Sequence, residues 1–358
     1  MSRYAVRLTE VGRRDTASVG GKSASLGELA RAGALVPPGF ALTTTAFGEA
    51  MAALDPVGQW RRRVAGLDPD DIDAVAGVTG QLRHRIETAP VPEGVQREVR
   101  RHYRGLAADG TTPVAVRSSA TSEDGVDASF AGLQDTYLWV RGDESVLTHV
   151  RRCWASLYSV ESVTYRLRRG LPEDGLAMAV VVQQMVDPRC SGVLFTRSPL
   201  TGDRSVMVVE AAWGLGSAVV SGDVTPDHLV VNKVTGEVVK RAVSRKLRRH
   251  RRDPSGAGVQ ADDVPAGEQE VCCLRDEEVA ALVEAARRIE DHYGSPQDIE
   301  WAIAVPDPAE PSGERLYILQ SRPETVWARR KAAPVAPPRP RAFDHVVARL
   351  GRSAGTGG

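Results

Sequence analysis

The sequence predicts a mixed α/β protein of the α+β type, and three observations lead to this prediction. Residues 176–233 alternate short β-like apolar runs with glycine-rich turns, as in an antiparallel-rich subdomain. Residues 47–106 have a mostly helical pattern, and residues 276–294 form a clear amphipathic helix. With 358 residues, of which 42% are hydrophobic, the chain is long enough for two or three domains or subdomains.

The N-terminal elements follow from spacing and turn residues. A helix is predicted over about 22–32, because its leucines repeat at helical spacing and Gly33 follows as a stop. Residues 35–47 hold a Pro-Pro-Gly turn, a short β-like run and threonines that can cap the next helix. The charged and uneven pattern of residues 47–106 predicts a helical insertion that is exposed.

The central elements are predicted as strands joined by small-residue loops. Residues 114–116 form a strand that ends in Arg117 and a loop rich in serine and threonine. A second small-residue turn precedes a β-like run at 136–140. Residues 176–186 are apolar over a limited length, which favours a buried strand.

The C-terminal part begins with the helix at 276–294. Its acidic start complements the helix dipole, its apolar residues share one face, and Gly294 closes it. Two β-like runs follow at 298–305 and 315–323. Residues 329–358 are rich in proline, arginine and glycine, and we expect a largely disordered tail.

Charge and cysteine usage exclude several classes of protein. Lys and Arg together number 46, as do Asp and Glu, so the net charge is zero and favours neither nucleic acid nor an anionic membrane as partner. No apolar run is long enough for a membrane span, and the first residues lack the apolar core of a signal peptide. The four cysteines show no metal-ligand spacing. A reduced, cytoplasmic protein is expected.

Lys22 lies in a Gly-Lys-Ser tripeptide that resembles half of a phosphate-binding P-loop. The full motif requires a glycine five residues before Gly21, and Thr16 stands there. No β-rich run leads into the loop, so a P-loop is disfavoured. A turn lysine without a function and a lysine that meets a nucleotide in another way both remain open.

Other segments carry residue types that a nucleotide triphosphate requires. Arg117 is at a strand end and is followed by serines, Gly132 permits close approach of the backbone to a phosphate, and Thr136 offers a hydroxyl. Each also has a plain structural explanation, since a strand-end arginine is usually a surface salt bridge and a glycine-rich turn is usually only a turn.

The last two predicted strands offer a second set. Because side chains alternate along a strand, Asp298 and Glu300 share one face of the first of these strands. Gln320 and Arg322 likewise share one face of the second strand. If these strands pair, an acid, an amide oxygen and a guanidinium converge and could hold Mg²⁺ and a migrating phosphoryl group. A solvated strand face is the alternative.

Taken together, these segments resemble the ATP-binding domain of phosphoenolpyruvate synthase, pyruvate phosphate dikinase and the rifampicin phosphotransferases. Six ordered stretches, covering residues 15 to about 326, carry the resemblance: VGGKSASLGELARAGALVPPGFALTT, VAVRSSATSEDGVDASFAGLQDTYLWV, VVVQQMV, SGVLFTRSPLTGD, VVEAAWGLGSAVVSGDVTPDHLVV and HYGSPQDIEWAI…LYILQSRPET. The resemblance implies an ATP-grasp-like fold, with ATP clamped between an N-terminal subdomain (1–190) and a C-terminal subdomain (191–328).

The resemblance also implies roles for residues at matching positions. The residues implied to bind ATP are Lys22, Arg117, Gly132, Thr136, Gln183, Met185, Val186, Glu300, Gln320 and Arg322. Glu300 and Gln320 match the Mg²⁺ ligands, while Lys22, Arg117 and Arg322 match the basic residues that hold the phosphates and act in transfer. The segment 183–186 matches the strand that meets ribose and adenine, and Glu210 fits the same cleft.

The function implied is ATP-dependent phosphotransfer with ATP and Mg²⁺. Members of the family pass phosphate through a histidine on a mobile domain, and none of the seven histidines here has the matching Thr-Cys/Ser-His-Ala setting. Three hypotheses follow. The chain is an ATP-binding component, giving AMP, whose partner protein supplies the carrier histidine; or it is a stand-alone enzyme that phosphorylates or ligates a small molecule; or it is a nucleotide-binding regulatory module.

Two glycine-rich or basic stretches need other interpretations. Residues 214–222 lack the dinucleotide-binding pattern, because Val219 stands where glycine or alanine is required. Residues 245–252 are strongly basic but lack interleaved aromatics, which disfavours nucleic acid. We expect a solvated or ATP-facing strand there, with Lys246 approaching phosphate.

Overall fold

The computed structural model describes residues 4–106, 111–120, 135–254, 258–305 and 315–327. Residues Met1–Pro323 form one compact unit and Glu324–Gly358 a second. In the second unit the Trp327 backbone N–H donates to the Glu324 carboxylate at 2.7 Å. The tail predicted at 329–358 lies outside the described residues, and the division into subdomains at residue 190 stays a prediction.

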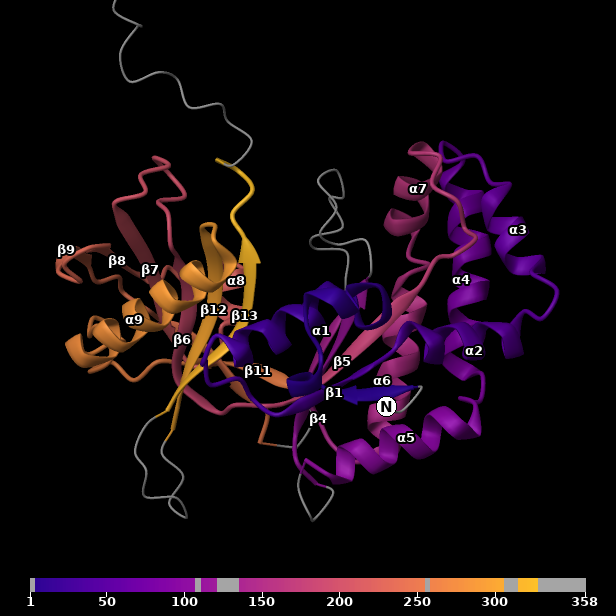
Figure 1. The fold of residues 1–358 in the computed structure, drawn as a ribbon, viewed down its shortest axis with the longest axis horizontal. Helices are drawn as coiled ribbons and strands as arrows, with labels where there is room; N and C mark the ends of the chain where they lie inside the picture. Colours follow the sequence, from indigo (N-terminus) through magenta and orange to yellow (C-terminus); the bar gives the residue numbers. More distant parts are fainter. Residues whose placement is uncertain (1–3, 107–110, 121–134, 255–257, 306–314, 328–358) are drawn as a thin grey trace, which may run out of the picture. The chain divides into compact units, whose positions relative to one another are not determined.

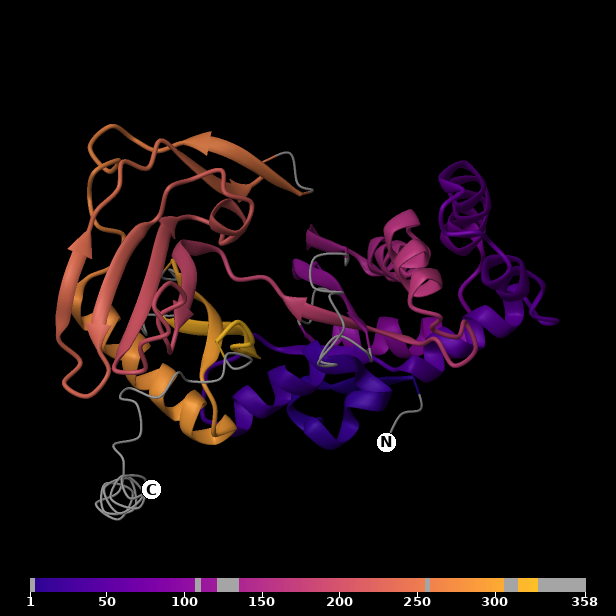
Figure 2. The same cartoon turned by 90° about the horizontal axis from the view of Figure 1, so that it is seen from above.

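Among the described residues of the compact unit, the strands form two large antiparallel sheets and one hairpin (Figure 1). The first sheet has the order β1-β2-β5-β3-β4, with bounds Ala5–Arg7, Gly39–Leu42, Met178–Gln184, Val114–Ala120 and Thr136–Val140. The second has the order β13-β12-β6-β7-β8-β9, with bounds Leu316–Pro323, Gln297–Ala304, Pro188–Phe195, Val206–Trp213, Asp227–Asn232 and Val238–Ala242. The hairpin of β10 (Arg248–Arg252) and β11 (Val259–Asp263) projects from the second sheet (Figure 2).

The helices divide between the two sheets. The helices are α1 (Thr16–Arg31), α2 (Thr44–Leu54), α3 (Gln59–Ala65), α4 (Ile72–Thr88), α5 (Glu93–Arg104), α6 (Asp143–Ser156), α7 (Val160–Arg168), α8 (Ser217–Val220) and α9 (Asp276–Tyr293), with short 3₁₀ turns at Leu8–Glu10 and Arg13–Asp15. Helices α2–α7 accompany the first sheet, whereas α9 packs on β12 and β13 (Figure 1). The mixed α/β architecture predicted from the sequence is therefore confirmed.

Alternation along the strands of the first sheet produces two hydrophobic cores. On β2, Phe40 and Leu42 join the core beneath the helices, while Ala41 between them joins the other core. On β5, Val182 and Val181 divide in the same way. Since successive side chains point to opposite faces, both faces of this sheet are covered.

The expectation of an exposed segment at 47–106 is wrong. Although the segment is helical as predicted, Met51, Leu82, Val99 and Tyr103 from it are at most 2% exposed and form much of the first core. The uneven charge pattern reflects helices with a narrow apolar face and a wide polar one, which still bury the apolar side.

Helix α1 is common to both sheets. Its Leu26 and Leu29 are buried in the second core, together with Val181 of β5 and Trp301 of β12. The helix is interrupted at Gly20, where φ is 74°, so the segment that carries Lys22 begins after a kink. The predicted helix at 22–32 is confirmed, and an additional turn precedes it.

Helix α9 agrees closely with its prediction. It begins with three acidic residues and ends at Gly294, which has φ 69° in the left-handed region. Its His292 Nε2 meets the Glu28 carboxylate of α1 at 2.7 Å. The contact ties α9, which covers the second sheet, to the helix that both sheets share.

We predict that Gly20→Ala destabilises the fold by about 2–4 kcal/mol, because the residue combines a left-handed φ with a tight contact. A Cβ at Gly20 would lie 2.2 Å from the Ser119 backbone oxygen. Gly33→Ala is the matched control, since Gly33 has φ 77° and nothing within 4 Å of its Cβ position. Chemical unfolding measures both. Equal losses in the two variants would show that the Ser119 contact contributes nothing.

We also predict a pH-dependent effect of Glu28→Gln. Burial raises the pKa of Glu28, but hydrogen bonds from the Arg13 N–H, His292 and Arg31 outweigh it and leave that pKa below its usual value. A lowered pKa means that the ionised group stabilises the fold above about pH 4.5 and that this stability is lost as the pH falls through the lowered pKa.

The variant should therefore be less stable than the parent by roughly 1–3 kcal/mol at pH 7, and the difference should shrink in acid. Unfolding free energies at pH 7 and pH 3.5 measure this. A difference that grows toward low pH would contradict the assignment.

Candidate functional site

A cavity of about 280 Å³ lies where the two large sheets meet. It is lined by residues of both sheets and of the turn that leads into α8: Ala115, Arg117, Thr136, Leu138, Gln183, Gln184, Met185, Val186, Pro188, Ser191, Gly192, Val193, Leu215, Gly216, Ser217, Val220, Glu300, Trp301, Ala302 and Leu319. Apolar side chains line much of it, and a few charged and polar groups converge, as in small-molecule sites.

The structure brings together most of the residues singled out from the sequence. Those lining this cavity are Arg117, Thr136, Gln183, Met185, Val186 and Glu300. Gln320 contacts Arg117 directly. Lys22 donates to the backbone oxygen of Ser118, the residue after Arg117, and Arg322 lies two residues after Gln320 on β13. Gly132 lies outside the described residues.

Arg117 is the centre of the charged end of the cavity. Its Nη2 donates to Gln320 Oε1 at 2.5 Å and lies 3.8 Å from Glu300 Oε2. Glu300 and Gln320 are opposite each other in the β12–β13 register, so the predicted pairing of these strands is confirmed. The Arg117 Nε is buried without a hydrogen-bond partner among the described residues, which leaves a donor for an anionic ligand.

Lys22 reaches the same region from α1. Its Nζ donates to the backbone oxygen of Ser118, the residue after Arg117, at 2.9 Å. The expectation that the strand ends at Arg117 is wrong, because β3 continues to Ala120 and pairs with β5 over that length. The contact of Lys22 therefore places its ammonium beside the middle of β3, without a glycine-rich loop.

Arg322 lies further along the same strand pair. It is opposite Asp298 in the β12–β13 register, and its Nε donates to Asp298 Oδ2 at 3.2 Å. The Arg322 side chain is 60% exposed, so its guanidinium remains accessible to a ligand. Asp298 holds it on the side of the sheet that also carries Glu300.

The segment 183–186 forms the opposite end of the cavity. Gln183 is buried, and its Nε2 donates to the Pro37 oxygen at 3.2 Å. The Met185 backbone N–H donates to the Pro113 oxygen at 2.9 Å. These bonds fix the segment and leave the Met185 and Val186 side chains lining the wall, which suits a flat apolar ring.

The donor set at Glu300 and Gln320 fits Mg²⁺ bound together with phosphates. Among the described residues, no cluster of three or more His, Cys, Asp or Glu could hold a metal by itself. Mg²⁺ in nucleotide sites needs only one or two protein oxygens, since waters and phosphate oxygens complete the shell. The Gln320 amide oxygen has two lone pairs, so it can accept from Arg117 and still bind a cation.

Lys246 and Glu210 both lie outside the cavity wall. The expected approach of Lys246 to phosphate is wrong: its side chain is fully buried, and its Nζ donates to Asp227 Oδ1 at 2.5 Å and to the Ser244 oxygen at 2.8 Å. Glu210 lies on β7 between Val193 and His228 of the adjacent strands. Its role remains a prediction.

Sequence reasoning missed the part of the wall that residues 191–193 and 215–217 form. The signal for this part of the wall is the Gly-Leu-Gly-Ser turn at residues 214–217, whose glycines permit close approach of a ligand to the backbone. Leu319 was also missed, because it precedes Gln320 on a strand judged by its polar face alone.

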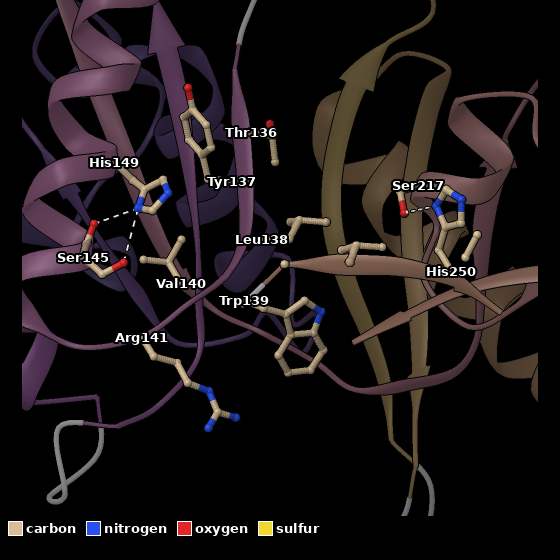
Figure 3. A pocket seen from close by; sticks show the side chains of 13 residues that line it. Thr136, Tyr137, Leu138, Trp139, Val140, Arg141, Ser145, His149, Ser217 and His250 are labelled. Carbon is tan, nitrogen blue, oxygen red and sulfur yellow. Dashed lines mark hydrogen bonds between the residues drawn. The ribbon is translucent and has the colours of Figure 1, made fainter. Parts of the chain in front are cut away.

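A second cavity of about 780 Å³ adjoins the first, and Thr136, Leu138 and Ser217 line both. Strand β4 forms one side, and residues of the β10–β11 hairpin form the other (Figure 3). The Ser217 hydroxyl and the His250 ring face each other within this cavity (Figure 3).

Comparison with known proteins is consistent with this geometry. Residues 16–342 match the family model described as pyruvate phosphate dikinase, AMP/ATP-binding domain. The chain is 41% identical over 353 residues to a probable phosphoenolpyruvate synthase of Staphylothermus marinus, covering 92% of this chain and 42% of the relative. It is 45% identical over 326 residues to a rifampicin phosphotransferase of a Streptomyces species, covering 90% and 36% respectively.

A rifampicin phosphotransferase of Bacillus subtilis is 36% identical over 328 residues, with 91% of this chain and 36% of the relative covered. The chain thus spans less than half the length of these relatives. In the described part of the chain, no helix combines the length and apolar character that crossing a bilayer requires. The match over most of the chain identifies it as a member of the pyruvate phosphate dikinase AMP/ATP-binding domain family.

Proposed function

We propose that this protein binds Mg-ATP in the cavity between the sheets and transfers a phosphoryl group to an acceptor carried by another protein domain. One observation carries the proposal: Arg117 of the first sheet contacts Gln320 and approaches Glu300 of the second. A guanidinium, an amide oxygen and a carboxylate from distant segments thereby lie beside one another at the cavity. Such positioned charges and oxygen ligands are what phosphoryl transfer uses.

In this proposal the residues divide the nucleotide between them. Met185 and Val186 contact the adenine, and the charged end takes the triphosphate. Lys22, Arg117 and Arg322 neutralise phosphate oxygens, because fixed cations stabilise the charge that spreads over the transferred group. Glu300 and Gln320 would hold Mg²⁺, which screens the phosphates when bound.

Removing ATP from water strengthens these interactions. Arg117 has a side chain only 15% exposed, so its attraction to a phosphate is screened less than that of a surface arginine. The Arg117 Nε, which has no partner in the described part of the chain, adds a second donor in the same guanidinium plane. Arg117 is therefore suited to bidentate contact with phosphate, which a lysine could not provide.

The relatives support an acceptor on another domain. This chain aligns with only 36–42% of the two relatives first named, so their names describe proteins with further parts. We propose that a carrier histidine outside this domain receives the phosphoryl group and that AMP is the nucleotide product.

The acceptor assay tests this proposal directly. The protein is incubated with ATP and Mg²⁺, alone and with a histidine-bearing domain of a relative, and nucleotides are separated by chromatography. We expect AMP only when that domain is added. AMP or ADP formed with a small molecule alone would contradict the proposed acceptor, and ATP binding without turnover in every mixture would indicate a regulatory module.

We predict that Arg322→Ala lowers the transfer rate by roughly 10²–10³-fold, because the guanidinium stabilises charge in the transition state. Lys22→Ala should instead weaken ATP binding while leaving the fold intact. Arg204→Ala is the control, since Arg204 is an exposed arginine outside the cavity wall. Single-turnover rates and ATP titrations separate the two effects. A rate within about twofold of the parent for Arg322→Ala would remove that residue from the mechanism.

A further inference from the structure

Ser217, His250 and Asp223 form a series of three side chains in contact with one another. None of the three has a role in the proposed binding of phosphate or adenine. The Ser217 Oγ is 2.9 Å from His250 Nδ1 (Figure 3). His250 Nε2 is in turn 3.3 Å from Asp223 Oδ2. Ser217 lines both cavities, whereas the Asp223 side chain is more than half exposed. This series of three side chains therefore runs from the surface to the wall of the proposed ATP site.

The partners determine what Ser217 offers to a ligand. An ionised carboxylate only accepts, so a neutral His250 carries its proton on Nε2, facing Asp223. The Nδ1 atom then accepts from the Ser217 hydroxyl. The hydrogen of Ser217 is thereby occupied, and its Oγ presents lone pairs that can accept from a ligand hydroxyl.

Backbone contacts fix where Ser217 lies. The Leu215 N–H donates to the His250 oxygen at 2.8 Å, and the Ser191 hydroxyl donates to the Gly214 oxygen at 2.5 Å. The turn that leads to Ser217 is thus attached to β10 on one side and to β6 at Ser191 on the other.

The register of β6 gives the position relative to the charged end. Val193 pairs with Glu300, whereas Ser191 pairs with Ala302. Ser191 is therefore displaced from the Glu300 row by about 7 Å, the length of two strand residues. The displacement is toward Pro188, which follows the segment proposed to contact adenine. Because Ser191 anchors the turn that leads to Ser217, we place Ser217 between the proposed phosphate end and the proposed base end.

We infer that Ser217, positioned by His250 and Asp223, accepts a hydrogen bond from one ribose hydroxyl of ATP and so distinguishes ATP from the analogue that lacks this hydroxyl. The sugar is the part of a nucleotide that lies between base and phosphates, and its hydroxyls are donors. This inference rests on the proposed function, because it assumes that ATP occupies the cavity.

Equilibrium titration calorimetry tests the inference with ATP, 2′-deoxy-ATP and 3′-deoxy-ATP in the presence of Mg²⁺. All titrations are carried out at pH 8. The parent should bind ATP roughly tenfold more tightly than one of the two analogues, as loss of one hydrogen bond implies. Ser217→Ala should bind ATP as weakly as the parent binds that analogue, so the preference disappears.

His250→Ala and Ser205→Ala complete the experiment. His250→Ala leaves the Ser217 hydroxyl but frees its orientation, so the preference for ATP should fall below the parent's while ATP still binds. It also provides the test if Ser217→Ala does not fold. Ser205→Ala is the control, since the exposed Ser205 hydroxyl donates to Asp203. It should keep the full preference.

Three results would overturn the inference. They are a parent with no preference against either analogue, a Ser217→Ala variant that keeps the parent's preference, and a phosphorylated Ser217 peptide after incubation with ATP. The last would identify Ser217 as a nucleophile. A parent that does not bind ATP would overturn the proposed function as well, whereas the first three results leave ATP binding in place.

Discussion

The attachment of helix α1 to both large sheets is the constraint on which the rest of the structure depends. At its N-terminal end, the Ser119 hydroxyl of β3 donates to the Val19 oxygen at 3.1 Å. Near its middle, the Ser25 hydroxyl donates to the Ser321 oxygen of β13 at 2.7 Å. After Ser25 the buried Leu26 and Leu29 join the core that α1 shares with both sheets. The same helix therefore fixes the positions of the two sheets relative to each other.

This attachment also explains the geometry of the candidate site. Ser119 is two residues from Arg117 on β3, and Ser321 is next to Gln320 on β13, so the bonds that anchor α1 also fix the two site residues. Arg117 and Gln320 meet at 2.5 Å across the junction. Gly20 is needed because the helix approaches β3 too closely for a Cβ, and Lys22 follows directly after this approach.

The sequence predicted well what local alternation controls. Asp298, Glu300, Gln320 and Arg322 were placed correctly, because period-two alternation and one pairing hypothesis determine which side chains meet. It could not predict what depends on tertiary packing. The burial of Lys246 against Asp227 needs a partner that the sequence separates from it by 19 positions. The core made by the helices at 47–106 was missed because their charged faces dominate the pattern.

The most direct measurement of the central claim is a crystal structure with Mg²⁺ and a non-hydrolysable ATP analogue. We predict that the triphosphate lies against Arg117 with Glu300 and Gln320 at the cation, and that the base lies against Met185. A nucleotide bound elsewhere, for example against Trp139 in the adjoining cavity, would contradict the account. So would a triphosphate at the 185–188 end of the cavity.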